Sequence, residues 1–199
     1  MDDSNNTLAY YNEHAEEFVF LTKSADMVLL YDMFQKYLKS GGKILDIGCG
    51  SGRDSKYFME QGYDVVAVDG SEKICELASQ YIGKNVLCIK FQNISFANEF
   101  DGIWACASLL HIPKNEMAVV LKKLSNALKT NGYIYASFKY GQVERINGER
   151  FFNDYTEKDI DELFNHESRL NVVEWSITED VREGRSDEKW LNVVAVKIT

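Results

Sequence analysis

Short apolar runs alternate along the chain with longer segments whose apolar residues recur at helical spacing. A run of β-branched apolar residues is typical of a strand covered on both faces, whereas a period of three to four residues is typical of an amphipathic helix. The first pattern predicts strands at residues 43–47, 63–69, 86–91, 100–107 and 133–140. The second predicts helices over residues 24–40, 53–62, 71–81 and 114–129. A further helix begins after Thr156, where Asp159 can cap the first turn.

Two more runs, residues 172–178 and 190–198, also have the pattern of strands. No helical pattern separates them, so we expect an antiparallel pair. Together with the strand–helix alternation before it, this pair predicts an α/β fold. We expect a doubly wound, Rossmann-like, mostly parallel sheet of seven strands with an antiparallel C-terminal hairpin and helices on both faces. A length of 199 residues suits one domain, so residues 1–199 are expected to form a single unit.

Residues 44–52 carry the strongest functional signal, because an apolar strand there ends in three glycines at alternate positions. Glycine tolerates positive φ and lets a ligand approach the backbone closely. The third glycine of a dinucleotide fingerprint would fall at position 53, which is Arg53. Asp46 precedes the glycines, and its carboxylate would repel a pyrophosphate but suit a cationic ligand. S-adenosylmethionine, with an ammonium and a sulfonium, is such a ligand; an ordinary strand-to-helix turn is the alternative.

Polar residues after the neighbouring strands extend this loop into a candidate nucleoside site. Asp69 ends the second strand, where a carboxylate accepts hydrogen bonds from ribose hydroxyls. Asn93 follows the third strand, and its amide can pair with the exocyclic amine of adenine. Arg53 begins a helix and suits the carboxylate of a methionyl group. Taken singly, these three residues also fit a turn or cap, a solvated loop and an exposed surface arginine.

Together these motifs resemble the class I S-adenosylmethionine-dependent methyltransferases over nearly the whole chain. Asp-Ile-Gly-Cys-Gly-Ser-Gly at 46–52 matches the glycine motif of that family, and Asp69 matches its ribose-binding acid. Residues 50–55, 107–113 and 136–141 resemble the small tellurite-resistance-type (TehB-like) and ubiquinone-biosynthesis-type members. The resemblance implies S-adenosylmethionine as the methyl donor and S-adenosylhomocysteine as the product. The cofactor-binding residues we expect are Tyr11, Asp46, Gly48, Cys49, Gly50, Gly52, Arg53, Asp69, Gly70, Ser71, Asn93, Ile94 and Cys106.

The N-terminal segment, residues 1–23, resembles a lid that closes over the cofactor in these members. Its aromatic residues would exclude water from the sulfonium and hold it by cation–π contact. Tyr11 is the best single candidate for that contact. The alternative is an amphipathic helix whose aromatic residues belong to the core.

Candidate acceptor-side residues follow the fourth and fifth strands. Methyl transfer from a sulfonium is an in-line displacement, which needs alignment of the reactants and exclusion of water. It needs a base only if the acceptor must lose a proton. His111 is the candidate base, and a structural hydrogen bond is the alternative role. Residues 141–154 form an arginine-bearing insertion, which favours an anionic acceptor unless neighbouring acids pair with those arginines. The candidate acceptor-binding residues are Lys139, Tyr140, Arg145, Arg150 and Arg182.

Composition narrows the class of partner. The formal net charge of −9 argues against broad nucleic-acid binding, which needs clustered Lys and Arg. Four cysteines without paired spacing indicate a reduced protein, and no Cys/His spacing predicts a metal site. The chain shows neither a signal-peptide pattern nor an apolar run of about 20 residues, so we expect a cytoplasmic protein without a membrane span.

These observations favour a methyltransferase that acts on a small molecule. A tRNA or protein methyltransferase is a second hypothesis, which the acidic balance disfavours. A non-catalytic regulatory or partner protein that binds S-adenosylmethionine is a third, because the glycine loop and Asp69 fit it equally well. A dinucleotide-dependent oxidoreductase is disfavoured by Asp46 and Arg53. The sequence gives no indication of the oligomeric state.

Overall fold

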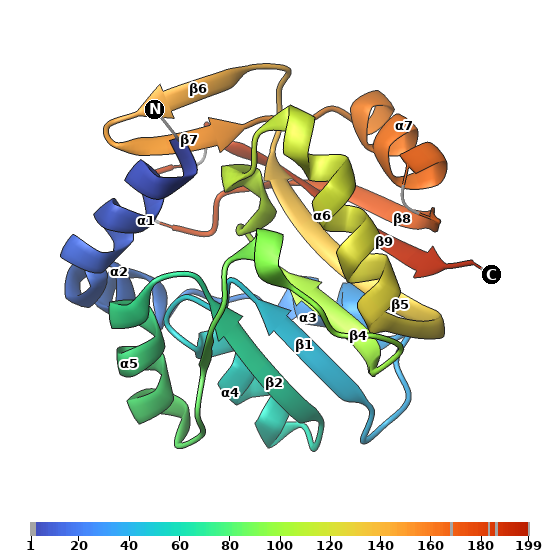
Figure 1. Cartoon of the computed structure of the whole chain (residues 1–199), viewed down its shortest axis with the longest axis horizontal. Coiled ribbons are helices and arrows are strands. Elements are labelled where there is room, and N and C mark those ends of the chain that lie inside the picture. The colour runs from blue at the N-terminus through green and yellow to red at the C-terminus, as the bar shows by residue number, and fades with distance from the viewer. Residues whose placement is uncertain (1–2, 168, 183, 186, 199) are drawn as a thin grey trace.

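The computed structural model describes residues 3–167, 169–182, 184–185 and 187–198. The strands of its main sheet are β1 Lys43–Ile47, β2 Asp64–Asp69, β3 Leu87–Cys88, β4 Phe100–Ala105, β5 Leu128–Lys139, β8 Leu170–Glu179 and β9 Lys189–Lys197. They form one seven-stranded sheet in the order β3-β2-β1-β4-β5-β9-β8 (Figure 1). Strands β1 to β5 are parallel, β9 is antiparallel to β5, and β8 is antiparallel to β9. The predicted fold class is confirmed.

Helices cover both faces of this sheet. On one face lie the helices α3 Val28–Gln35, α4 Arg53–Glu60 and α5 Glu72–Ile82. On the other lie α6 Lys114–Ala127 and α7 Glu157–Glu167. Side chains alternate accordingly along β1, because Ile44 packs with α3 and α4 whereas Leu45 and Ile47 pack with α6. The near-continuous apolar run of β1 follows from this coverage on both faces.

Four short elements lie near the carboxyl ends of the parallel strands (Figure 1). They are the helices α1 Asp3–Glu13 and α2 Ala15–Thr22, and the hairpin of β6 Glu144–Asn147 and β7 Arg150–Asn153. Strand β1 lies between β2 and β4, at the point where the strand order reverses. Ligands of doubly wound sheets bind at such a point, so the fold places these four elements around the expected site.

Local signals in the sequence account for the starts of α5 and α7. Ser71 caps α5, because its Oγ accepts from the amide of Ile74 at 3.2 Å. Asp159 accepts from both the amide and the hydroxyl of Thr156, at 2.9 and 2.7 Å, before α7. The third strand is shorter than its pattern predicts, because the chain bends into a 3-10 turn at Phe91–Asn93. The β6–β7 hairpin has no counterpart in the predicted elements, since its strands of four residues are too short for a readable period.

A cluster of large aromatic side chains ties the helices to the sheet. Phe34 of α3, Phe58 of α4, Trp104 of β4 and Tyr135 of β5 are each 0% exposed. The rings of Trp104 and Tyr135 stack with centroids 4.0 Å apart, and Phe34 lies 5.4 Å from Trp104. Such rings bury large apolar areas and gain from specific ring geometry, so this cluster fixes α3 and α4 against the sheet.

Replacement of Phe34 by alanine tests the contribution of this cluster. Phe34→Ala leaves a cavity among fixed neighbours, so the free energy of unfolding should fall by about 3–5 kcal/mol. Urea denaturation measures the change. Leu29→Ala is the matched control, because Leu29 belongs to the same helix but is 81% exposed, and its effect should stay within about 0.5 kcal/mol. Equal losses in the two variants would contradict the assignment of the core.

Candidate functional site

The glycine loop after β1 has a backbone shape that only glycine adopts easily. Gly48, Gly50 and Gly52 have φ values of +71°, +53° and +77°, in the left-handed region. The amide of Gly48 donates to the carbonyl of Val68 at 2.8 Å, which fixes the turn against β2. A Cβ atom on Gly48 would lie 2.4 Å from the Cβ of Ser108. The loop therefore excludes side chains at the point where a ligand would approach.

Two cavities meet at this loop. The β2 cavity, of about 330 Å³, extends toward the end of β2, and the β5 cavity, of about 210 Å³, extends toward the end of β5. Their shared wall consists of Tyr11, Phe18, Gly48, Gly50, Ala107 and His111. The β2 cavity is also lined by Leu8, Asp69, Gly70, Phe91 and Gln92. The β5 cavity is also lined by Met27, Arg53, Cys106, Lys139, Arg150 and Trp190.

Asp69 holds the glycine loop and faces the β2 cavity. Its carboxylate accepts from the amides of Gly50 and Ser71, at 3.1 and 3.0 Å. Burial raises the pKa of Asp69, and the amide hydrogen bonds act against that rise. Each carboxylate oxygen can accept more than one hydrogen bond. Asp69 therefore retains acceptor capacity toward the hydroxyl groups of a ligand.

Asp54, in the first turn of α4, gathers donors from several elements. Nε and Nη2 of Arg53 donate to its two oxygens at 2.6 and 2.9 Å. The hydroxyl of Tyr31 and Nε1 of Trp104 donate at 2.6 and 2.8 Å. Burial alone would raise the pKa of Asp54, but Arg53 and these donors outweigh it and lower the pKa. Arg53 is held on the wall of the β5 cavity, where its Nη1 also donates to the carbonyl of Thr22 at 3.1 Å.

Asp46 lies behind the glycine loop and on neither cavity wall. The alternation of β1 turns its side chain toward α4, where Ser55 Oγ donates to it at 2.6 Å. Burial, together with the charge of Asp54, raises the pKa of Asp46 to about 8. Asp46 is therefore largely protonated at neutral pH. Contrary to the sequence-based expectation, the carboxyl group of Asp46 therefore does not face a ligand in either cavity.

Helix α1 is fastened over both cavities through His111. Tyr11 Oη lies 2.9 Å from His111 Nε2, and His111 Nδ1 lies 2.6 Å from the carbonyl oxygen of Phe151. Because a carbonyl only accepts, Nδ1 carries the proton and Nε2 accepts from the hydroxyl of Tyr11. Burial lowers the pKa of His111 to about 4 and raises that of Tyr11. At neutral pH the two cavities are therefore separated by an uncharged imidazole and a phenol.

Two further contacts attach α1 to the rest of the molecule. Thr7 Oγ1 accepts from the amide of Phe151 in β7 at 3.0 Å. Asn12 Oδ1 accepts from Ser71 Oγ at 2.8 Å and from the amide of Lys73 at 3.1 Å. Helix α1 thus connects the β6–β7 hairpin beside the β5 cavity to the start of α5 beside the β2 cavity.

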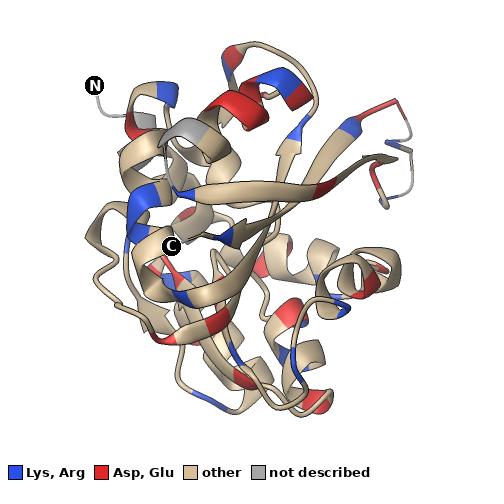
Figure 2. Ribbon diagram, turned by 90° about the vertical axis from the view of Figure 1, so that its right-hand side faces the viewer, with Lys and Arg blue, Asp and Glu red and all other residues tan. Residues whose placement is uncertain are grey.

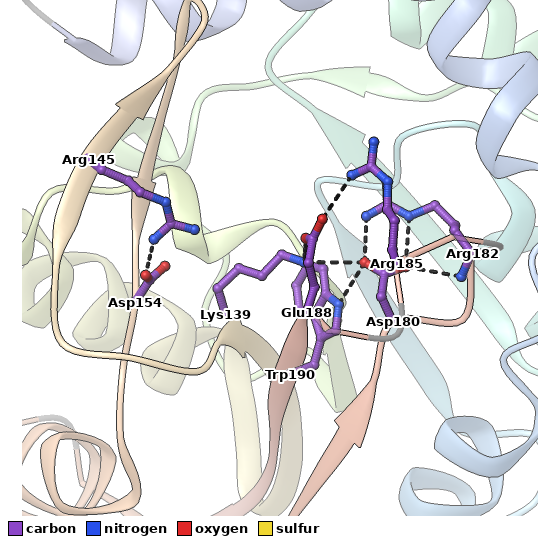
Figure 3. A network of polar contacts seen from close by, with 8 residues as sticks. All are labelled: Lys139, Arg145, Asp154, Asp180, Arg182, Arg185, Glu188 and Trp190. Carbon is purple, nitrogen blue, oxygen red and sulfur yellow. Dashed lines mark hydrogen bonds and ion pairs between the residues drawn. The ribbon is translucent and has the colours of Figure 1, made fainter.

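Cationic side chains of the β5 cavity are tied to acids (Figure 3). Lys139 lies 3.2 Å from Asp180 and also pairs with Glu188. Asp180 accepts from Arg182 at 2.6 Å and from Trp190 Nε1 at 3.0 Å. Burial opposes ionisation of Asp180, but these donors prevail and lower its pKa. Lys139 and Arg182 therefore sit in a neutralised network at the cavity wall.

The predicted site residues fall into two groups. Those on the cavity walls are Tyr11, Gly48, Cys49, Gly50, Arg53, Asp69, Gly70, Cys106, His111, Lys139, Arg145, Arg150 and Arg182. Those away from the walls are Asp46, Gly52, Ser71, Asn93, Ile94 and Tyr140. Gly52 packs under α5 and Ser71 caps it, so both act on the shape of the loop. The ligand contacts of all these residues stay predictions.

The adenine-side loop differs from its predicted arrangement. The 3-10 turn places Phe91 and Gln92 on the wall of the β2 cavity, while Asn93 is exposed and Ile94 is buried in the core. Phe18, one of the aromatic residues of the predicted lid segment, lies on the wall between the cavities. Sequence reasoning missed Phe91, because the turn after β3 has no local signal.

Comparison with known proteins agrees with this architecture. Residues 45–136 match the family model described as a methyltransferase domain. The chain is 28% identical over 147 residues to a putative methyltransferase, YqeM, of Bacillus subtilis, covering 66% of this chain and 56% of that protein. It is 27% identical over 139 residues to a probable S-adenosyl-L-methionine-dependent methyltransferase, TehB, of Haemophilus influenzae, covering 66% and 48%. The chain thus spans about half the length of these curated relatives.

The fold extends this similarity to almost the whole chain. The structure of 1,6-didemethyltoxoflavin-N1-methyltransferase from Burkholderia thailandensis, solved with 1,6-didemethyltoxoflavin and S-adenosylhomocysteine bound, is similar with a TM-score of 0.79 at 22% identity. The match covers 98% of this chain and 88% of that one. The fold is that of the S-adenosylmethionine-dependent methyltransferases. Residues 45–136 also match the methyltransferase-domain model, so the resemblance expected from the sequence is confirmed.

Two features bear on partners. Among the helices in the described ranges, none is both long and apolar enough to cross a membrane. Glu13 and His14 of the α1–α2 junction and Glu149 of the hairpin bring potential metal ligands within 4.8 Å of one another. The two carboxylates are exposed to solvent, where such clusters are common without an ion.

The protonation of Asp46 makes a pH-dependent prediction. A folded-state pKa near 8 against an ordinary value near 4 means that the wild-type protein loses stability as pH rises through this interval. Asp46→Asn does not titrate, so its urea midpoint should rise relative to the wild type between pH 5 and pH 8. Asp161→Asn, an exposed carboxylate on α7, controls for the loss of one charge. Parallel pH profiles of Asp46→Asn and the wild type would contradict the assignment.

The Tyr11–His111 hydrogen bond makes a second prediction. Tyr11→Phe removes a net contribution of about 1 kcal/mol, so amides of α1 should exchange with deuterium roughly fivefold faster. Hydrogen-exchange mass spectrometry over residues 3–13 measures this. Tyr140→Phe is the control, because Tyr140 lies on neither cavity wall. If α1 exchanged at the same rate in Tyr11→Phe as in the wild type, the proposed fastening would be wrong.

Proposed function

We propose that the protein transfers the methyl group of S-adenosylmethionine to a small-molecule acceptor. The observation that carries this proposal is the meeting of two cavities at the glycine loop. One contains a carboxylate with spare acceptor capacity, Asp69, and the other a fixed guanidinium, Arg53. S-adenosylmethionine has a nucleoside at one end and an α-amino acid at the other. A carboxylate and a guanidinium on opposite sides of the glycine loop suit those two ends.

The residues present fit that ligand at three points. Asp69 would hold the ribose hydroxyls, and the left-handed backbone at Gly48 and Gly50 leaves room for close approach. Arg53 donates hydrogen bonds to Asp54 and to the carbonyl of Thr22. Because a guanidinium has five N–H groups, others remain for the carboxylate of a ligand. Phe91 and Gln92 would border the base.

When bound, S-adenosylmethionine supplies a methyl group made electrophilic by the sulfonium. The chain itself would align the reactants and exclude water. Tyr11 and Phe18 on the wall between the cavities are the residues placed for that exclusion. If the acceptor must lose a proton, His111 Nε2 would accept it through the Tyr11 hydroxyl, as a weak base, because burial lowers its pKa to about 4.

Residues 1–23 and 141–154 complete this proposal as lid and acceptor-side insertion. The contacts of Thr7 and Tyr11 with the hairpin and with His111 support a lid. The insertion supplies Arg145, Arg150 and Phe152 to the β5 cavity, which supports its placement beside the acceptor. We take residues 1–199 as one catalytic unit.

A small acceptor is favoured over a macromolecule. The β5 cavity has a volume of about 210 Å³, and acidic and basic positions are mixed along the ribbon in Figure 2, with a net charge of −9. Nucleic acid is attracted by clustered cations. The thiols of Cys49, Cys75, Cys88 and Cys106 are free, which supports a reducing compartment such as the cytoplasm.

Binding of S-adenosylhomocysteine tests the cofactor site. Asp69→Ala removes a charged hydrogen-bond acceptor, so the dissociation constant measured by calorimetry should rise about 10- to 100-fold. Asp64→Ala is the matched control, because Asp64 begins the same strand and is exposed at its far end. Its affinity should match that of the wild type. Binding of NADH in place of S-adenosylhomocysteine would overturn the proposal.

Methyl transfer separates the remaining hypotheses. S-adenosylmethionine with a labelled methyl group is incubated with the protein and with the small-molecule, RNA and protein fractions of a cell extract. Label in the small-molecule fraction is expected. Label in RNA or protein would indicate a macromolecular acceptor, and cofactor binding without any transfer would indicate a non-catalytic protein.

A further inference from the structure

The β5 cavity carries more cations than its function as a methionyl site requires. The cationic residues on its wall are Arg53, Lys139, Arg145, Arg150, Arg182 and Arg185. Within the described part of the chain, five of the six contact a carboxylate. Arg53 pairs with Asp54, and Arg145 pairs with Asp154. Lys139 and Arg182 share Asp180, and Arg185 lies 3.5 Å from Glu188 (Figure 3).

Arg150 differs from the other five. The described residues place no carboxylate within ion-pair distance of it, and its buried Nε has no hydrogen-bond partner. Its guanidinium carbon lies 4.8 Å from the ring centroid of Tyr10 and 5.2 Å from that of Phe152. These cation–π contacts hold the guanidinium beside the two rings. The charge of Arg150 and a hydrogen bond from it lower the pKa of Tyr11, against the larger effect of burial.

An arginine in this state gains from an anionic ligand. Partial removal of water weakens the solvation of the cation, and no acid among the residues that the structure describes pairs with it instead. The planar fork of a guanidinium matches the two oxygens of a carboxylate, and stacking pre-organises it for that contact. Glu179 also lies on the wall, but it is exposed and forms no ion pair with Arg150 in the structure.

Apolar side chains make up much of the remaining wall. Met27, Leu30 and Leu110 line the same cavity as Arg150, together with Phe18 and Phe152. A ligand that fills this space therefore needs an apolar body beside its anionic group.

We propose that Arg150 binds the carboxylate of the acceptor, and that the acceptor has an apolar or aromatic body. This inference rests on the proposed function, because it places the acceptor beside the methionyl group in the β5 cavity. It distinguishes Arg150 from Arg145, Arg182 and Lys139, whose charges are already paired within the protein.

Calorimetry with two isosteric probes tests this assignment. Benzoate and benzamide, which differ in charge but hardly in shape, are titrated into the protein saturated with S-adenosylhomocysteine. Benzoate should bind the wild type, and benzamide about tenfold more weakly or less. Arg150→Met keeps the stacked stem and should weaken benzoate about tenfold or more, while Arg150→Lys keeps the charge without the fork and should weaken it less. Lys158→Met, on the exposed face of α7, is the control and should bind benzoate like the wild type.

The outcomes separate this inference from the proposed function. No benzoate binding, equal affinity for both probes, or unchanged benzoate affinity in Arg150→Met would each overturn the role of Arg150. S-adenosylhomocysteine should bind Arg150→Met and the wild type equally, and a selective loss in the variant would place Arg150 in the cofactor site instead. Failure of the wild type to bind S-adenosylhomocysteine would overturn the proposed function itself.

Discussion

The buried carboxylate of Asp54 is the interaction on which the rest of the site depends. It joins α4 to α3 through Tyr31 and to β4 through Trp104, and it fixes the guanidinium of Arg53 at the cavity wall. A buried charge is stable only when its partners supply both opposite charge and hydrogen bonds, and removal of one partner is costly. Asp54 meets that condition with donors from three elements. The position of Arg53 on the wall of the β5 cavity and the packing of α3 and α4 against β4 therefore depend on the same carboxylate.

The carboxylate of Asp54 also affects the protonation state of the neighbouring Asp46. Asp46 lies close enough for the charge of Asp54 to raise its pKa, but its donor is a hydroxyl and the guanidinium of Arg53 is bound to Asp54. Because Arg53 compensates the charge of Asp54, the neutral form of Asp46 avoids one uncompensated negative charge in a dry region. Asp46, which precedes the glycine motif, thus has a structural role behind the loop. Asp69 is the aspartate that faces the β2 cavity.

Closure of the cavities depends on contacts between segments far apart in the chain. The N-terminal helix α1 meets the hairpin through Thr7 and Phe151, and it meets the turn after β4 through Tyr11 and His111. Arg150 stacks on Tyr10 of the same helix. Any motion of α1 would therefore change the walls of both cavities and the surroundings of His111 together.

Local patterns in the sequence determined the fold and the glycine loop. The strand–helix alternation, the glycines of 48–52 and the caps at Ser71 and Thr156 act over a few residues, so their effects can be read without a structure. Only the tertiary structure decided which way Asp46 points, which arginines have acids and where the β6–β7 hairpin lies. These depend on partners such as Asp154 and Asp180, and on the face toward which a strand turns each side chain. A charge in a sequence has no partner until the chain folds, and that is why the sequence could indicate which charged residues line the cavities but not which of them are paired.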